Sequence, residues 1–497
     1  MHPLIVFNGR FNDFTVNCNK IKALLIDRNE IQKIYYNTQN LPLPIKKLDL
    51  NGKYVLPGFT DCHTHLISRG LELQRIDLTG GKSLDSCLQK ITGEKHKHDI
   101  VFAQNYDDSD WSGDEKERLN RRTLDRITKK PLIMRRVCGH CAVVNTSALK
   151  CIPRGWHYIQ SNTGRLCENA ALFLNDIFKP DQATLLKAIG LGMQEAAKNG
   201  VTTVHEISDP QRIELLLKFK RCSGLKTRFV LYIYEQHAST MFNAGLVNSW
   251  GDDFIRFAGI KIFLDGSIGA RTAALKQPYV KCRNRGKVLL TQVPLKNLIK
   301  KAEKNGTQLM IHAIGDRAID FGLKVLKPYI DKKNSCRHRL EHLELLNQRL
   351  IERLARMNII ASMQPNFVRR WQNPGGLYEK TLGHRFIDMN PFKSLARAGI
   401  HLVFGSDCMP IGPLFGLKGA TDHPSAKNRL SLMQALACYT VKPAYAAFEE
   451  HHKGDFKPGK FADFVILDQD PEKIDDTDKL NISMVMLGGE IIYRNPA

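Results

Sequence analysis

The sequence predicts an α/β protein built on a (β/α)8 barrel with insertions and a small accessory domain. Three observations support this fold. The chain has 497 residues, which is long for one domain. Eight short apolar, β-rich runs alternate with mostly helical patterns. Polar residues that can bind metals close several of these runs, and the carboxyl ends of parallel strands are where a barrel carries its catalytic residues.

The two chain ends contain short strands rather than barrel units. Residues 1–56 have turns at Asn8-Gly9 and Asn51-Gly52 and are too short to form a domain alone. Residues from about 452 onward show the same pattern in ADFVILD and MVMLGGEIIYR. The barrel is therefore expected between these ends.

The barrel strands can be followed along the chain. The first ends at His63 and His65, and a long excursion at about 67–182 follows it, with strand-like IVFAQNY and PLIMRRV. The second, at 201–207, comes after a helical run that stops at Gly200. The other six are expected at 226–235, 256–265, 307–313, 337–343, 359–365 and 401–407.

The segment GFTDCHTHL at 58–66 carries the strongest functional signal. His63 and His65 are two residues apart, so on an extended strand both imidazoles point to the same face. Two converging neutral imidazoles begin a divalent metal site. Other metal-competent residues lie in or close later predicted strands: Lys261, His312, His342 and Asp407.

Several further motifs follow one another along the chain: VLPGFTDCHTHL, AQNYDDSDW, RRTLDRITKKPLIMRRVCGHCAVVNTSAL, GIKIFLDGSIGARTAAL, IHAIGDRAID, LEHLELL, GSDCMP and GDFKPGKFADFVILDQDP. Taken together and in this order, they resemble those of the amidohydrolase superfamily, and within it the N-substituted formamide deformylase-like metal-dependent hydrolases. The resemblance implies a β-sandwich formed by 1–56 and 452–497, a barrel at 57–451 and an insertion at about 67–182.

The same resemblance implies a binuclear centre, with two zinc ions expected. Asp407 would bind metal and act as the general base that takes the proton of the attacking hydroxide. Lys261 would bridge the ions only if CO₂ carbamylates it, because an ammonium repels metals. Pairing of Lys261 with Asp265 or Asp316, and a ligand role for Glu168, stay open. The implied ligands are His63, His65, Lys261, His312, His342 and Asp407.

Four residues are expected to contact the substrate. His140, Asp107 and Trp111 belong to the insertion motif, and Asp316 belongs to a matched barrel motif. They would reach the substrate if the insertion folds over the barrel mouth. Asp107 could equally be a turn residue. Asp316 and Glu341 are also candidates for hydrogen bonds to metal-binding histidines.

The expected activity is metal-dependent hydrolysis of a C–N bond in a linear N-substituted amide or formamide. A cyclic amide or an aminohydrolase substrate would suit the same site. A noncatalytic binding or regulatory protein on this scaffold is a further alternative, although the complete ligand set argues against it.

Charge and composition limit the classes of partner that this protein is expected to have. The net charge of +23 is spread along the chain without a basic tail, which favours a lysine-rich solvated surface over a nucleic-acid partner. No run approaches 18 apolar residues, so no membrane span is expected. The 12 cysteines are scattered, with the closest spacing in CGHC at 138–141, and indicate reduced thiols in a cytoplasmic protein. A small-molecule substrate is expected, and a homo-oligomer is compatible with the sequence.

Overall fold

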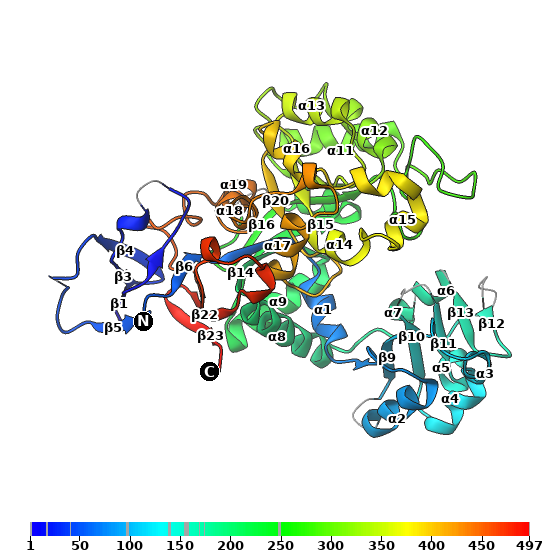
Figure 1. Ribbon diagram of the computed structural model, residues 1–497. Coiled ribbons are helices and arrows are strands. Elements are labelled where there is room, and N and C mark those ends of the chain that lie inside the picture. Colours follow the sequence, from blue (N-terminus) through cyan, green and yellow to red (C-terminus); the bar gives the residue numbers. More distant parts are fainter. Residues whose placement is uncertain are drawn as a thin grey trace. The chain divides into compact units, whose positions relative to one another are not determined.

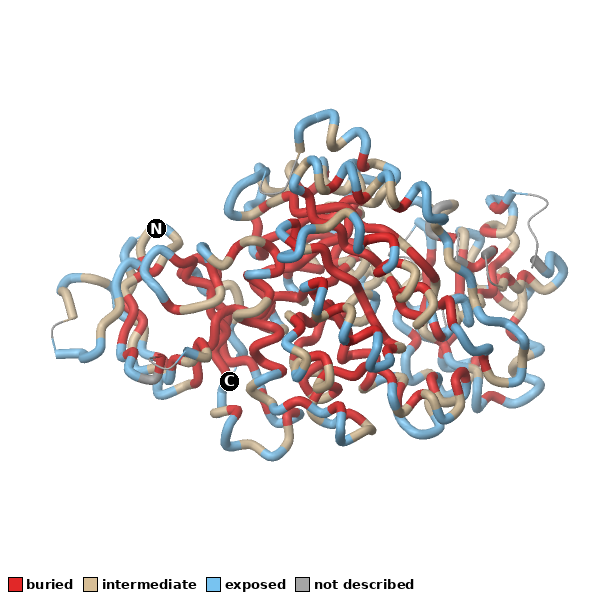
Figure 2. Tube along the Cα trace, turned by 90° about the horizontal axis from the view of Figure 1, so that it is seen from above, coloured by how far each residue is buried: buried red, intermediate tan, exposed pale blue. Residues whose placement is uncertain are grey.

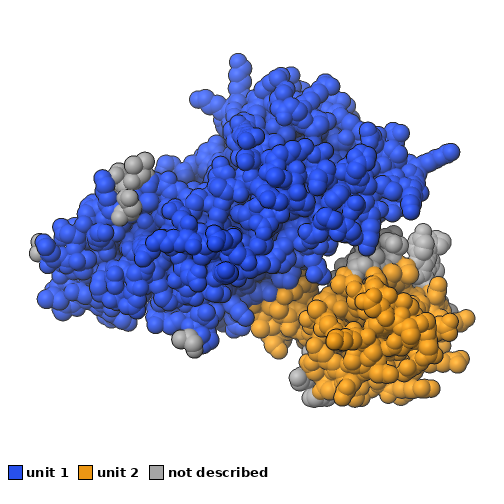
Figure 3. All heavy atoms as spheres, in the orientation of Figure 1, with its two compact units in different colours: residues 1–66, 193–497 blue, residues 67–192 orange. Residues whose placement is uncertain are grey.

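The computed structural model describes residues 2–15, 18–39, 41–95, 99–137, 141–153, 159–167, 169–172, 174–246 and 250–496. The chain divides into two compact units, which Figure 3 colours separately. Unit 1 contains Met1–Leu66 and Met193–Ala497, and unit 2 contains Ile67–Gly192.

Unit 1 is built around eight parallel strands (Figure 1). Neighbours along the chain are neighbours in the sheet, and an isolated parallel bridge between Thr64 and Asp407 joins its first and last strands. The predicted α/β barrel is thereby confirmed. Its strands are β7 (Phe59–Thr64), β14 (Val201–Ser208), β15 (Arg228–Tyr234), β16 (Ile255–Phe263), β17 (Gln308–Ala313), β18 (Arg339–His342), β19 (Ile360–Met363) and β20 (Leu402–Phe404).

The barrel strands are buried along almost their whole length, as the red stretches of Figure 2 show. This burial explains their near-continuous apolar runs, which are typical of parallel strands covered by helices. The helices that alternate with them or follow the last strand are α8 (Gln182–Lys198), α9 (Pro210–Ser223), α10 (Ala238–Asn243), α11 (Gln292–Lys304), α12 (Asp316–Leu326), α13 (Gln348–Arg356), α14 (Pro365–Trp371), α15 (Leu377–Leu382), α16 (Phe392–Arg397), α17 (Pro413–Thr421), α18 (Leu432–Ala437) and α19 (Val441–Ala446).

Two further sheets are made by the chain ends. The first is β4 (Glu30–Tyr35), β3 (Ala23–Asp27), β1 (Leu4–Phe7) and β5 (Lys46–Asp49). The second is β2 (Arg10–Phe11), β6 (Tyr54–Pro57), β21 (Phe464–Leu467), β22 (Ile482–Leu487) and β23 (Glu490–Arg494).

Residues from both chain ends share one apolar core, which includes Val6, Leu24, Val55, Phe464 and Met486. Strand β6 pairs antiparallel with β21, so the N- and C-terminal segments also share a sheet. The predicted association of the two ends is therefore confirmed. The exact boundaries between sandwich and barrel stay a prediction, because both lie in unit 1.

Unit 2 contains the predicted insertion. Its sheet has the order β12 (Ile159–Gln160), β13 (Arg165–Cys167), β11 (Cys141–Val144), β10 (Leu132–Arg136), β9 (Val101–Tyr106) and β8 (Ile76–Asp77). The sequence predicted β9 and β10 but not the shorter β8, β11, β12 and β13. Helices α2 (Leu84–Glu94), α3 (Gly113–Arg118), α4 (Arg121–Ile127), α5 (Thr146–Lys150), α6 (Asn169–Leu172) and α7 (Leu174–Ile177) complete it, and α1 (Leu66–Glu72) begins at the boundary between the units. Across the described ranges, no helix is long and apolar enough to cross a membrane.

Candidate metal centre

Four histidines and one aspartate gather where the barrel strands end. His63 lies in β7 and His65 directly after it, His312 lies in β17, His342 ends β18, and Asp407 follows β20. The rings of His63 and His342 are 4.9 Å apart between centroids, and those of His312 and His342 are 4.4 Å apart. Because parallel strands end on one rim, residues far apart in the sequence meet there.

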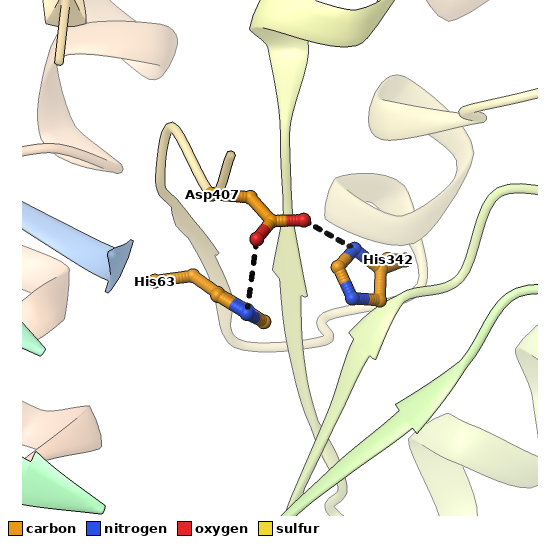
Figure 4. A group of neighbouring side chains, drawn as sticks. All are labelled: His63, His342 and Asp407. Atoms are coloured by element: carbon orange, nitrogen blue, oxygen red, sulfur yellow. Dashed lines mark ion pairs between the residues drawn. The ribbon is translucent and has the colours of Figure 1, made fainter. Parts of the chain in front are cut away.

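The carboxylate of Asp407 is the common neighbour of three imidazoles. Its Oδ1 lies 3.2 Å from His65 Nε2 and 3.6 Å from His63 Nε2. Its Oδ2 lies 3.9 Å from His342 Nδ1, so the two oxygens face different histidines in Figure 4. Burial acts to raise the pKa of Asp407, but the neighbouring histidines hold that pKa well below its usual range. The group is therefore an anion among imidazoles.

The backbone around Asp407 positions this carboxylate. Its N–H donates to His63 O at 2.7 Å, the contact that joins the last barrel strand to the first. Asp407 has φ 56° and His342 has φ 72°, both in the left-handed region, which costs of order 1–3 kcal/mol for a side-chain-bearing residue. A Cβ on Gly405 would lie 2.5 Å from His63 N, so only glycine allows the strands to approach this closely.

A buried ion pair of Glu341 and Arg339 orients the His63 ring through its Nδ1 atom. Its Nδ1 lies 2.5 Å from Glu341 Oε2, and Glu341 Oε1 accepts from Arg339 Nε at 2.6 Å. Glu341 and Arg339 have no exposed surface. Burial acts to raise the pKa of Glu341, but Arg339 and His63 hold it well below its usual range. With its proton on Nδ1, His63 presents the bare Nε2 to Asp407, as histidines that bind metals commonly do.

The other two barrel histidines have different partners. His342 Nδ1 is 2.8 Å from Gln364 Oε1, which fixes its ring. His312 Nε2 is 3.1 Å from the carbonyl oxygen of Gly266, so this nitrogen already has an acceptor. Burial, followed by the charge of Lys261, lowers the pKa of His312 to about 3. A metal would take His312 Nε2 only by displacing the Gly266 contact.

Lys261 also reaches the centre. It is 1% exposed, and its Nζ lies 3.3 Å from His63 Nε2 and 5.0 Å from the centroid of the Phe263 ring. Burial lowers the pKa of Lys261 to about 8. The alternative acids are otherwise engaged: Asp265 accepts from the backbone of Ile314 and two further residues, and Asp316 accepts from Lys276 N at 2.8 Å.

The donor set fits a divalent cation. The ligand atoms of His63, His342 and Asp407 lie within 4.8 Å of one another, and His65 joins them through Asp407. Imidazole nitrogen and carboxylate oxygen are the ligands that zinc-like ions accept. As an amine, Lys261 points a donor at the lone pair of His63 Nε2; as a carbamate, it would offer oxygen atoms instead.

A second group of donors is less suited to a metal. Glu303, Cys336 and His338 also lie close together. The N–H of Leu309 donates to His338 Nδ1 at 3.0 Å, and His338 Nε2 is 2.8 Å from Glu303 Oε1. His338 must therefore carry its proton on Nε2 and donate it to Glu303. No bare imidazole nitrogen is left for an ion, and the group is a hydrogen-bonded pair with a neighbouring thiol.

The predicted substrate residues of the insertion have local roles in unit 2. Asp107 Oδ1 accepts from the N and Oγ of Ser109 at 3.0 and 2.6 Å, as a turn residue does. Trp111 is 4% exposed and stacks on Tyr106, with ring centroids 5.7 Å apart. His140 and Glu168 lie outside the described residues.

Several residues that build the centre were not singled out in the sequence. Arg339, Gln364 and Gly405 hold Glu341, His342 and the last strand in place. A charged residue inside a buried strand is a detectable signal, and Arg339 in RHRLEHL is one. Gln364 and Gly405 are ordinary residues at strand ends, and only the fold reveals their contacts.

Comparison with known proteins identifies the family. Residues 46–493 match the amidohydrolase family. The chain belongs to this family. It is thus a metal-dependent hydrolase of carbon–nitrogen bonds.

Individual relatives agree with this assignment. This amidohydrolase is 28% identical to YtcJ of Bacillus subtilis (strain 168), over 90% of each chain. It is 24% identical to an N-substituted formamide deformylase of Arthrobacter pascens, over 95% of this chain and 94% of the other. An uncharacterized metal-dependent hydrolase from Pyrococcus furiosus has the same fold, with a TM-score of 0.84, 24% identity and coverage of 95% of this chain and 100% of the other.

Proposed function

We propose that this amidohydrolase cleaves a linear N-substituted amide or formamide, and that two zinc ions bind at the candidate centre. The observation that carries the proposal is the Asp407 carboxylate in contact with His63, His65 and His342. The relative named N-substituted formamide deformylase supports the substrate class. The proposed ligands are His63, His65, Lys261, His312, His342 and Asp407.

The residues of the centre have separable tasks in this reaction. Divalent ions bound there would lower the pKa of water and polarise the scissile carbonyl. Asp407, anionic at neutral pH, accepts the proton of the attacking water at a carboxylate oxygen and returns it to the leaving nitrogen. Glu341 holds His63 in the tautomer that presents Nε2.

Lys261 is proposed to act as a carbamate. Its neutral amine attacks CO₂, and the N–C bond forms as one C=O π bond opens and its electrons move to oxygen. The nitrogen then gives a proton to solvent, which leaves an anionic carboxylate at the end of the side chain. This change would remove a cation that stands 3.3 Å from His63 Nε2 and would supply carboxylate oxygens as further ligands for divalent ions. An ammonium at the same place would oppose the binding of two dications.

The activity is tested with the zinc-loaded protein and a panel of open-chain N-alkyl formamides, N-alkyl acetamides, lactams and aminohydrolase substrates. Release of the amine from the open-chain amides is expected, and Asp407→Asn should lower kcat by about 10²–10⁴-fold. Cleavage of lactams or deamination without open-chain turnover would replace the proposed substrate class. Tight zinc binding with no turnover of any substrate would favour a binding protein.

The role of Lys261 is tested by elemental analysis with and without bicarbonate. The wild type should hold about two ions per chain in bicarbonate, and Lys261→Ala should lose at least one. Lys261→Glu supplies a permanent carboxylate and should restore part of the metal content without full activity. A stoichiometry near one that neither bicarbonate nor Lys261→Ala changes would contradict the bridged centre.

A further inference from the structure

Two cysteines face each other on neighbouring strands of unit 2. Cys141 begins β11 and Cys167 ends β13, and the antiparallel register pairs them directly. Their sulfur atoms are 3.9 Å apart. Both residues are partly exposed, so a small oxidant can reach them. Their contact is not part of the proposed hydrolytic centre.

The backbone at this pair has the spacing that a disulfide requires. Val144 N donates to Gly164 O at 2.9 Å, which makes that pair a hydrogen-bonded one. Hydrogen-bonded and non-hydrogen-bonded pairs alternate along antiparallel strands, so the pair three steps away, Cys141 with Cys167, is non-hydrogen-bonded. Such pairs have Cα atoms about 4.5 Å apart, inside the range of about 4.4–6.8 Å that disulfides span. Side-chain rotation alone can close the gap between the sulfurs.

We propose that Cys141 and Cys167 are a reversible redox modification site that takes a peroxide as oxidant. One thiolate attacks the peroxide and becomes a sulfenic acid as the O–O bond breaks and hydroxide leaves. The second thiol attacks that sulfur, the S–S bond forms and water leaves. Overall, two thiols and one hydrogen peroxide give one disulfide and two waters, and a dithiol reductant reverses the reaction by exchange.

The position of the pair connects this modification with the predicted substrate segment. Cys141 directly follows His140 in the sequence, and Cys167 directly precedes Glu168. On β11, Val143 shares its face with Cys141 and packs in the core that holds Trp111. A disulfide would therefore fix the two strand ends next to His140, a predicted substrate residue, and Glu168, whose role as a metal ligand stays open. The effect on turnover rests on the proposed function; the modification itself does not.

The site is tested by mass spectrometry on the full chain. The reduced protein is treated with hydrogen peroxide, alkylated while folded and digested without reductant. A cross-linked peptide pair joining Cys141 to Cys167, two hydrogens lighter than the thiol pair and lost after dithiothreitol, is expected in the wild type and in Cys222→Ser. Cys222 is an exposed cysteine outside this pair and serves as the control.

Two outcomes would overturn the modification site. One is alkylation of both Cys141 and Cys167 under conditions that oxidise Cys222. The other is a bridge from Cys141 to Cys138, its neighbour in CGHC, in place of the cross-strand bridge.

The link to turnover has its own readout. With a substrate from the amide panel, peroxide should change kcat/KM of the wild type at least threefold, and dithiothreitol should restore it. Cys141→Ser and Cys167→Ser should show no reversible change. Equal turnover of the cross-linked and reduced proteins would overturn the link to the site. Because the mass readout needs no substrate, absence of hydrolysis leaves the test of the disulfide intact.

Discussion

The carboxylate of Glu341 offers the sharpest test of how the centre is organised. Glu341→Gln keeps the shape of the side chain but removes its charge. The glutamate accepts from His63 Nδ1 at 2.5 Å and from Arg339 Nε at 2.6 Å, and it has no exposed surface. The substitution therefore weakens the hydrogen bond that orients His63, a proposed metal ligand, and leaves the buried cation of Arg339 without the negative charge of Glu341.

Two magnitudes follow from these contacts. Loss of a partner that orients a metal-binding histidine typically lowers metal affinity about 10–100-fold. Loss of one member of a buried ion pair costs about 3–5 kcal/mol of stability. We expect the loss of stability to be about 3 kcal/mol, because Arg339 keeps hydrogen bonds to Cys62 O at 2.7 Å and Ser362 Oγ at 2.6 Å.

The assay separates the two effects with a matched control. Asp463 also pairs with a buried arginine through two hydrogen bonds, 2.6 and 2.9 Å from Arg228. Asp463→Asn should therefore cost similar stability in urea unfolding of the metal-free protein, while its zinc affinity by competition titration stays within twofold of the wild type. Zinc affinity of folded Glu341→Gln within twofold of the wild type would refute the orienting role.

Two further predictions concern the close approach at Gly405 and the buried His423. Gly405→Ala should lower stability by about 1–3 kcal/mol and reduce zinc affinity, because its Cβ would lie 2.5 Å from His63 N. The control Gly93→Ala has open space around its Cβ and should lower neither stability nor zinc affinity. A Gly405→Ala protein with the stability and zinc affinity of the wild type would contradict the close approach. His423 is buried, and burial lowers its pKa to about 4, so the unfolded chain, with an ordinary histidine pKa of about 6.5, binds the proton first as pH falls. The stabilising contribution of neutral His423 is present above pH 6.5 and is lost as pH falls toward 4. Between pH 7.5 and 5 the free energy of unfolding in urea should therefore fall by about 2 kcal/mol less for His423→Gln than for the wild type. An equal fall in both proteins would show that His423 does not cause this pH dependence.

The barrel was predictable because each strand carries its own local signal. Runs such as TQLMIHAIGD are apolar, end in a polar residue and precede a glycine-bearing loop, and the structure has a strand at each of the eight predicted places. Strands β11 and β13, of four and three residues, were not predicted. Their length is not the reason, because β18, β19 and β20 are equally short and were predicted. Unlike those strands, β11 and β13 lie outside the alternation of strand and helix that marks the barrel, and their pairing within unit 2 decides their conformation.

The proposed site shows the same division between local and nonlocal information. That His63, His342 and Asp407 meet follows from their positions at strand ends, which the sequence displays. That Glu341 rather than another acid turns toward His63 depends on the packing of side chains inside the closed barrel, which no local pattern encodes. For Trp111 the local pattern was not enough, since an aromatic residue in a motif gives no indication that the residue is buried.

In this chain the contacts that close the barrel also position the residues of the proposed site. The hydrogen bond from Asp407 N to His63 O joins the last strand to the first, and it also sets the carboxylate beside the imidazoles. The left-handed conformation of Asp407 is tolerated because that hydrogen bond and the close approach at Gly405 hold it. A change that opens this seam must therefore separate Asp407 from His63 as well. Stability and metal affinity should fall together for substitutions at the seam, whereas they separate for Asp463→Asn.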